Sequence, residues 1–346
     1  MKCYTRLDIS PGNWGSILKS YKTLKSGGLM RVFSQAFHTS YQYALATAFP
    51  EVTWYFVNGV WSANRPMPHN VFEHSDREFS KYDVYLAHGP DQYSALRGQL
   101  SSYGIDPRRI VYISHWSYNP EAWYHQAQGK PLEAFCHEVA DSPIVAVSHF
   151  MIQNFGFYSH ISCEAIPHYV PSHFYKNVEW VGDDGSYINV VNDFFAPLRG
   201  TGADFWVSLE EVPKKLYGGN NGEFGVGSLQ SIDDFAKTAS KARGYLWTGE
   251  KVAMSFAPLE AMACGCPIIA PDNMDWTKMF TPDEDMLLYT EGDKVSLANA
   301  LARYEGDESL RLRLSKNGRE TVARRFGLPQ FRAKWARTLE AAVADW

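Results

Sequence analysis

Residues 245–271, YLWTGEKVAMSFAPLEAMACGCPIIAP, constrain the fold more than any other part of the sequence. The segment begins and ends with short apolar runs of the kind that form buried strands. Between them, Ser255 is placed to cap a helix, and Pro258 falls in the first turn, where a missing N–H costs little. Gly265 can adopt the left-handed conformation that ends the helix, and Pro267 prevents its continuation. The order strand, loop, short helix, strand predicts an α/β unit with one carboxylate, Glu260, on its helix.

Alternating strand and helix patterns cover most of the remaining chain, as expected for Rossmann-like domains. The predicted strands of the first half are 29–37, 52–57, 82–87, 109–114, 143–147 and 163–166, with a helix over 120–140 and an irregular stretch over 59–80. Those of the second half are 187–192, 215–217, 245–247, 267–270 and 287–288, followed by three terminal helices.

A polar stretch rich in Gly and Asp, residues 177–186, separates the two halves and predicts a link between domains. We therefore expect an N-terminal domain over 1–176 and a C-terminal domain over 177–326. Residues 327–346 should form a final helix.

Composition excludes several classes of protein. The 346 residues suffice for two ordinary domains, and 45% of them are hydrophobic, which argues against wholesale disorder. The formal net charge of −5 argues against a surface coated with basic residues for nucleic acid. No run of about eighteen apolar residues is present, and the first residues lack the apolar segment of a secretory signal. Five cysteines without the spacing of a zinc or redox motif indicate reduced thiols, so we expect a cytoplasmic protein.

Histidines follow three of the predicted strands in the first half. His38, His88 and His115 come directly after, or close to, the ends of the strands at 29–37, 82–87 and 109–114. Open α/β sheets bind their ligands outside the carboxyl ends of the strands. These positions predict a ligand contact at this edge.

Glycine turns follow strands in the second half. Gly218 begins the turn GGNNG after the strand at 215–217, where a residue without a side chain can admit a nucleotide base or ribose. The turn is neither a Walker loop, because no Gly-Lys-Ser/Thr follows, nor a GxGxxG motif.

The residues PLEAMACGCPIIAP resemble the donor-site motif of GT-B glycosyltransferases of the family-4 type, which retain the anomeric configuration. The resemblance implies two Rossmann-like domains facing a cleft, a last helix that crosses back to the first domain, and contact between Glu260 and the ribose of a nucleotide sugar. An ionised carboxylate can accept hydrogen bonds from two adjacent hydroxyls. The family's preceding Glu is replaced here by Val252, so the chain looks like a divergent member. The resemblance is strongest over 185–326 and is only topological over 29–170.

The same resemblance implies the remaining site residues. Arg199, in the loop DFFAPLRGTG, takes the place of the family's diphosphate-binding Arg. A guanidinium suits this role because it can form bidentate hydrogen bonds with phosphate oxygens. The Lys that often follows is absent, and Lys214, Lys215 or Lys251 could replace it. His115 corresponds to the family's His near the sugar and leaving phosphate, so the resemblance makes it a better candidate than His88 or His38. The predicted catalytic residues are His115 and Arg199, and the predicted donor-binding residues are Glu260, Ser255, Gly249, Lys251, Lys215 and Gly218.

The resemblance implies transfer of a hexosyl or pentosyl group from a nucleotide diphosphate sugar to a hydroxyl acceptor. No pair of acidic residues lies in a loop suited to a metal, and no tightly bound cofactor is expected. The acceptor stays open: a glycan, a lipid-linked glycan, a protein, a small molecule or a modified DNA base. Two other readings remain, a catalytically degenerate nucleotide-sugar-binding subunit and a two-domain nucleotide-sugar epimerase.

Overall fold

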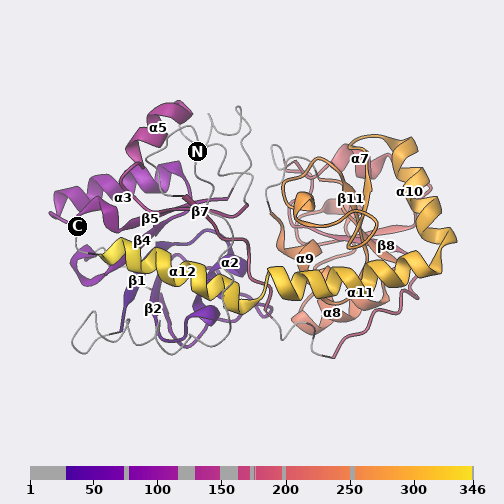
Figure 1. The fold of residues 1–346 in the computed structure, drawn as a ribbon, viewed down its shortest axis with the longest axis horizontal. Helices are drawn as coiled ribbons and strands as arrows, with labels where there is room; N and C mark the ends of the chain where they lie inside the picture. The colour runs from indigo at the N-terminus through magenta and orange to yellow at the C-terminus, as the bar shows by residue number, and fades with distance from the viewer. Residues whose placement is uncertain are drawn as a thin grey trace.

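The computed structural model describes residues 29–73, 78–115, 129–148, 163–171, 175, 177–196, 200–249 and 254–344. Figure 1 shows two α/β lobes side by side, joined by the chain and spanned by two helices that lie end to end. Each lobe is built on one sheet whose strands all run parallel.

The first lobe holds a seven-stranded sheet in the order β3-β2-β1-β4-β5-β6-β7. Its central strands β4 and β5 are buried along their whole length, as parallel strands covered on both faces require. The strands are β1 (Arg31–Gln35), β2 (Thr53–Val57), β3 (Val71–Glu73), β4 (Val84–Ala87), β5 (Ile110–Ser114), β6 (Ile144–Ala146) and β7 (Cys163–Ala165), and the helices between them are α2 (Thr39–Ala48), α3 (Pro90–Ser102) and α5 (Leu132–Glu138).

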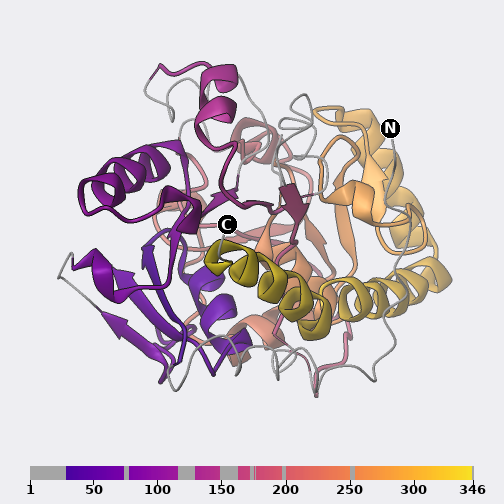
Figure 2. The ribbon, with the colours of Figure 1, turned by 60° about the vertical axis from the view of Figure 1, so that its left-hand side comes forward.

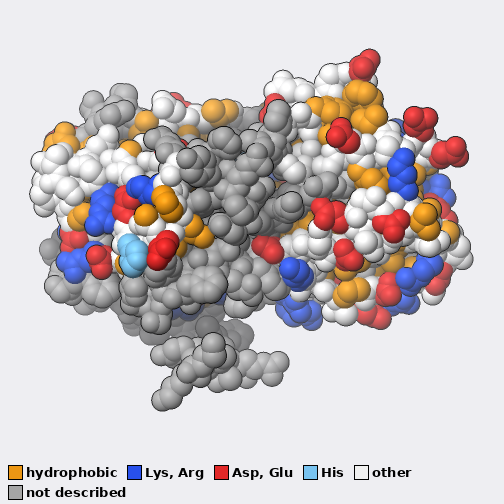
Figure 3. Space-filling model, turned by 90° about the horizontal axis from the view of Figure 1, so that it is seen from above, with side chains coloured by type: hydrophobic (Ala, Val, Ile, Leu, Met, Phe, Trp, Pro, Cys, Tyr) orange, Lys and Arg blue, Asp and Glu red, His pale blue; other side chains and the backbone are white. Residues whose placement is uncertain are grey.

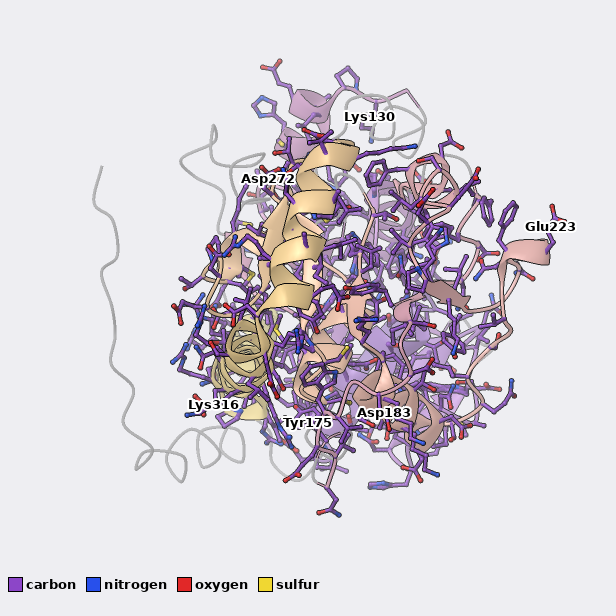
Figure 4. The ribbon with its side chains drawn as sticks, turned by 90° about the vertical axis from the view of Figure 1, so that its right-hand side faces the viewer. Lys130, Tyr175, Asp183, Glu223, Asp272 and Lys316 are labelled. Atoms are coloured by element: carbon purple, nitrogen blue, oxygen red, sulfur yellow. The ribbon has the colours of Figure 1, made fainter. Side chains whose placement is uncertain are left out.

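The second lobe holds a five-stranded sheet in the order β12-β11-β10-β8-β9. Helix α11 packs against α9 on this lobe. The strands are β8 (Tyr187–Val190), β9 (Lys214–Tyr217), β10 (Gly244–Leu246), β11 (Ile268–Pro271) and β12 (Leu287–Tyr289), and the helices are α7 (Ala203–Val207), α8 (Ile232–Lys241), α9 (Phe256–Ala263), α10 (Lys294–Gly306) and α11 (Glu308–Arg325). In Figure 4, Glu223 lies at the outer end of the segment that follows β9.

Helix α12 (Leu328–Val343) follows α11 after a break at Gly327 and packs over β4, β5 and α2 of the first lobe, as Figures 1 and 2 show. Trp335 on this helix is fully buried. The Arg332 guanidinium donates hydrogen bonds to the carbonyl of Ala48 and to the carboxylate of Glu51. The last helix therefore fastens the second lobe to the first.

Two local predictions are wrong. The predicted helix over 120–140 is interrupted in its described part, because Gly129 adopts a left-handed φ of 82° and Pro131 stands at the N-cap of α5, whereas residues 120–128 lie outside the described residues. The stretch predicted to be irregular contains β3, a short edge strand that pairs with β2. A strand of three residues is too short to show a recognisable pattern in the sequence.

The described surface mixes charges of both signs. On the face shown in Figure 3, Lys and Arg side chains lie among Asp and Glu side chains over the second lobe. Within the described parts of the chain, no helix combines the length and the apolar character needed to cross a bilayer.

Candidate functional site

The two sheets each have a point where the strand order reverses. In the first sheet this point lies between β1 and β4, and in the second between β8 and β10. Loops that leave the carboxyl ends of such neighbouring strands diverge to opposite faces and leave a crevice, which is where open α/β sheets bind ligands. The loops after β1, β8 and β10 all reach one cavity.

This cavity has a volume of about 780 Å³ and lies between the lobes. A volume of this size falls within the range of roughly 300–1,000 Å³ that is usual for ligand sites. From the first lobe it is lined by Phe37, His38, Thr39, Ser40, Val60 and Ser62–Arg65, and from the second by Val190–Asp193, Thr201, Gly218, Ser228–Ile232, Phe235, Trp247, Ser255–Ala257 and Glu260.

Close backbone approach shapes the second-lobe wall. Gly218 has a φ of 126°, and a Cβ at this position would lie 2.2 Å from the Val191 carbonyl oxygen. Only glycine therefore fits where the loops after β8 and β9 meet. The Asn192 side-chain oxygen accepts a hydrogen bond from the Gly219 N–H at 2.8 Å, and the Asn221 side-chain oxygen accepts one from the Phe194 N–H at 2.9 Å. These bonds hold the two loops together at the cavity wall.

A buried ion pair crosses the cavity between the lobes. The Arg65 Nη2 of the first lobe donates to Glu260 Oε1 on α9, and the two side chains are 9% and 8% exposed. Burial raises the pKa of Glu260, and the positive charge of Arg65 opposes that rise. Beside the pair, Asn64 Nδ2 donates to the Leu229 carbonyl at 2.9 Å. The loop that carries Asn64 and Arg65 is thus fixed to the second lobe at two points.

Three polar side chains form a chain of hydrogen bonds at the carboxyl ends of neighbouring strands β1, β4 and β5. The Oγ of Ser34 lies 2.9 Å from His88 Nε2, and His88 Nδ1 lies 2.9 Å from His115 Nε2. Phe37, which lines the cavity, stacks on the His115 ring with centroids 4.2 Å apart. Burial lowers the pKa of His88 to about 3 and lowers that of His115 well below its usual range, so both rings are neutral at pH 7.

A second group of rings forms around Phe256, the first residue of α9. The ring of His168 stacks on Phe256 with centroids 4.0 Å apart, and that of His38 stacks on it at 5.7 Å. Burial lowers the pKa of His168 to about 3. His168 was not among the predicted site residues, yet its ring stacks on Phe256, which lines the cavity.

The predicted site residues lie in different parts of the structure. Glu260, Ser255 and Gly218 line the cavity. His115 is not a lining residue, but its ring stacks on Phe37, which is. Ser255 stands at the N-cap of α9, but its side chain makes no capping hydrogen bond, which corrects that expectation. Gly249 is buried beside Trp247, where a Cβ would lie 2.6 Å from the indole nitrogen. Arg199 and Lys251 lie outside the described residues.

The prediction for Lys215 is corrected. Lys215 lies early in β9, away from the carboxyl end of the strand, and is not among the cavity-lining residues. Its Nζ pairs with the two carboxylate oxygens of Asp184 at 2.6 and 2.9 Å. The structure instead places this Lys against the link between the lobes.

Comparison with known proteins supports the fold prediction. The sequence profile of a family described as "Glycosyl transferase-like" matches residues 208–334, less than half of the chain. No curated protein sequence matches the chain significantly.

Solved structures resemble the chain over most of its length. HepE of Anabaena in complex with UDP is similar with a TM-score of 0.68 at 13% identity, over 90% of this chain and 100% of that one. Sucrose-phosphate synthase of Thermosynechococcus elongatus has a TM-score of 0.64 at 15% identity, over 89% and 98%. WaaG, a glycosyltransferase involved in lipopolysaccharide biosynthesis, has a TM-score of 0.61 at 12% identity, over 90% and 99%. The chain has the GT-B fold of two Rossmann-like domains, as predicted.

Because the Arg65–Glu260 pair is buried, we expect Arg65→Met to lower the free energy of unfolding more than Lys81→Met does. Arg65→Met leaves the Glu260 carboxylate buried without its partner, which should cost about 3 kcal/mol of unfolding free energy. Adding Glu260→Gln should restore most of that loss, because no unpaired charge remains. Urea unfolding of the single and double variants measures both effects.

Lys81→Met is the matched control, because its ion pair with Glu78 is about half exposed and should contribute less than about 1 kcal/mol. Equal losses in Arg65→Met and Lys81→Met, or additive losses in the double variant, would contradict a buried pair across the cavity.

Proposed function

We propose that the chain is a glycosyltransferase that moves a sugar from a nucleotide diphosphate sugar to a hydroxyl acceptor with retention of the anomeric configuration. The similar HepE structures are complexes with UDP and with UDP-glucose, so uridine nucleotides are the first donors to test. The second lobe would hold the donor, and the first lobe would present the acceptor.

The observation that carries this proposal is the position of the cavity. Both points of strand reversal open into it, and each lobe contributes one wall. Such an arrangement suits a two-part substrate, because a donor bound to one wall can meet an acceptor held by the other. Holding two reactants in the correct geometry supplies much of the rate enhancement in such a transfer.

The donor would bind through groups at the carboxyl ends of the second sheet. Ser255 and Phe256 place the N-terminus of α9 at the cavity, where unpaired backbone N–H groups favour the negative charge of a diphosphate. We propose that Arg199 adds a positive charge there, so that leaving-group stabilisation needs no metal. Glu260 would accept the ribose hydroxyls through its second carboxylate oxygen, because Arg65 binds Oε1.

His115 would act on the sugar side. Its ring is neutral and stacks behind Phe37, so it suits hydrogen bonding and positioning rather than the role of a charged acid. A retaining transfer needs no strong base from the protein, because the departing diphosphate can take up the acceptor proton. The role proposed for His115 is therefore to orient a hydroxyl in the transition state.

Product analysis separates this proposal from its alternatives. A transferase yields a glycosylated acceptor and free nucleoside diphosphate, also in the presence of EDTA. An epimerase yields an altered nucleotide sugar or free epimer, and a degenerate subunit binds the nucleotide and yields no product with any acceptor.

Donor affinity should depend on Glu260. Glu260→Gln keeps the shape of the side chain but removes the charge, so each lost charge-assisted hydrogen bond should cost about 1.5–3 kcal/mol, or roughly 10- to 100-fold in Kd. Calorimetric titration with UDP measures the change. Glu284→Gln is the control, because this half-exposed carboxylate of the same lobe lies outside the cavity. Equal UDP affinity in both variants would reject the ribose assignment.

Turnover should depend on His115 more than nucleotide affinity does. We expect His115→Ala to lower kcat by about 100-fold or more and to leave nucleoside diphosphate binding nearly unchanged, because the lost contact is made to the reacting sugar. Steady-state kinetics and a binding titration on the same variant test this. His137→Ala serves as control, since His137 is exposed on α5. Normal turnover of His115→Ala would move the role to His88 or His38.

A further inference from the structure

The hydrogen-bond chain behind the cavity joins three strands that are neighbours in the first sheet. Ser34 lies on β1, His88 follows β4 and His115 follows β5. Because these strands are parallel and adjacent, their carboxyl ends bring the three side chains into line. Both links measure 2.9 Å, which is the ordinary length of a hydrogen bond with a nitrogen donor.

The direction of each link follows from counting protons. Burial keeps both imidazoles neutral, so each ring has one N–H donor and one bare acceptor nitrogen. The single hydroxyl proton of Ser34 is donated to the Gln35 carbonyl at 2.9 Å. With its proton donated there, Ser34 Oγ accepts from His88, which places the proton of His88 on Nε2.

The second link is then determined. With its proton on Nε2, His88 has a bare Nδ1, which can only accept a hydrogen bond. The neighbouring atom is Nε2 of His115, which must be the donor. His115 thus carries its own proton on Nε2, and its Nδ1 is the unprotonated nitrogen.

We propose that Ser34 and His88 are positioning residues that hold His115 in the Nε2–H tautomer, so that His115 Nδ1 is an acceptor of hydrogen bonds. The pair sets both the tautomer and the plane of the His115 ring, which Phe37 and the edge of Tyr41 hold from two sides. A hydrogen bond at the far nitrogen commonly sets which nitrogen of a histidine is available for chemistry.

The consequence for substrate rests on the proposed function. A group that meets His115 Nδ1 in this tautomer must donate a hydrogen bond, as a hydroxyl of a transferred sugar or of an acceptor can. A bare phosphate oxygen can only accept, so it cannot form this bond.

Nitrogen NMR of the full chain, labelled with ¹⁵N-histidine, tests the tautomer directly at neutral pH. We expect the His115 Nδ1 resonance in the range of an unprotonated imidazole nitrogen and the Nε2 resonance in the protonated range. A protonated Nδ1, or two tautomers in comparable amounts, would overturn the proposal. This result does not depend on any nucleotide, so a failure of donor binding would count against the proposed function alone.

Ser34→Ala tests the source of the preference. Removing the hydroxyl takes away the acceptor of the His88 Nε2 proton, so His115 should shift from one tautomer to a mixture of two. Ser142→Ala is the matched control, because Ser142 is a buried hydroxyl of the same lobe that bonds to Tyr93 instead. An unchanged His115 tautomer in Ser34→Ala would overturn the role of Ser34. His88→Gln tests the role of His88 through the same His115 resonances. An unchanged His115 tautomer in that variant would overturn the role of His88.

Discussion

Parallel pairing of every strand within each sheet is the constraint from which the arrangement of this protein follows. Parallel strands need crossover connections, so helices cover both faces of each sheet and leave only its edges and ends to solvent. The carboxyl ends of the strands therefore gather the loops. Because each sheet reverses its strand order once, each offers one crevice, and the two crevices face a shared cavity.

Contacts across that cavity fix how the lobes meet. Phe256 of α9 inserts its ring beside His38 and His168, and Arg65 reaches Glu260 from the opposite wall. Removing two charges from water is costly, so a buried ion pair stabilises a structure only when both partners are present and aligned. The pair therefore constrains how the two lobes meet. A ribose that binds Glu260 would act on the same contact and would couple the donor to the position of the first lobe.

Local chemistry made the fold predictable from the sequence. Contacts between distant residues could not be predicted in this way. Gly265 was predicted to end α9 and does so with a φ of 83°, and its N–H donates to the Met262 carbonyl at 2.9 Å. Gly218 was predicted to lie at a ligand site because it begins a turn after a strand, and the structure places it at the cavity wall. Both predictions depend on a few neighbouring residues.

The residues that sequence reasoning missed act through partners far along the chain. Arg65 lies in a stretch without periodicity, and its partner Glu260 is 195 residues away. His88 was ranked below His115, but only the side-by-side order of β4 and β5 shows that the two rings are bonded. Lys215 was placed at the donor by its charge alone, and the strand's direction puts it at the opposite end. Pairing across a sheet or between lobes leaves no periodic signal in one sequence.

Hydrogen exchange of the full chain, with and without UDP, tests most directly whether the cavity between the lobes is a nucleotide site. Bound ligand slows the exchange of backbone amides that it covers or stabilises. The account predicts slower exchange on both walls, in residues 218–231 and 254–260 of the second lobe and in residues 60–65 of the first. Protection confined to another surface, or none with UDP, GDP or ADP at millimolar concentration, would contradict it.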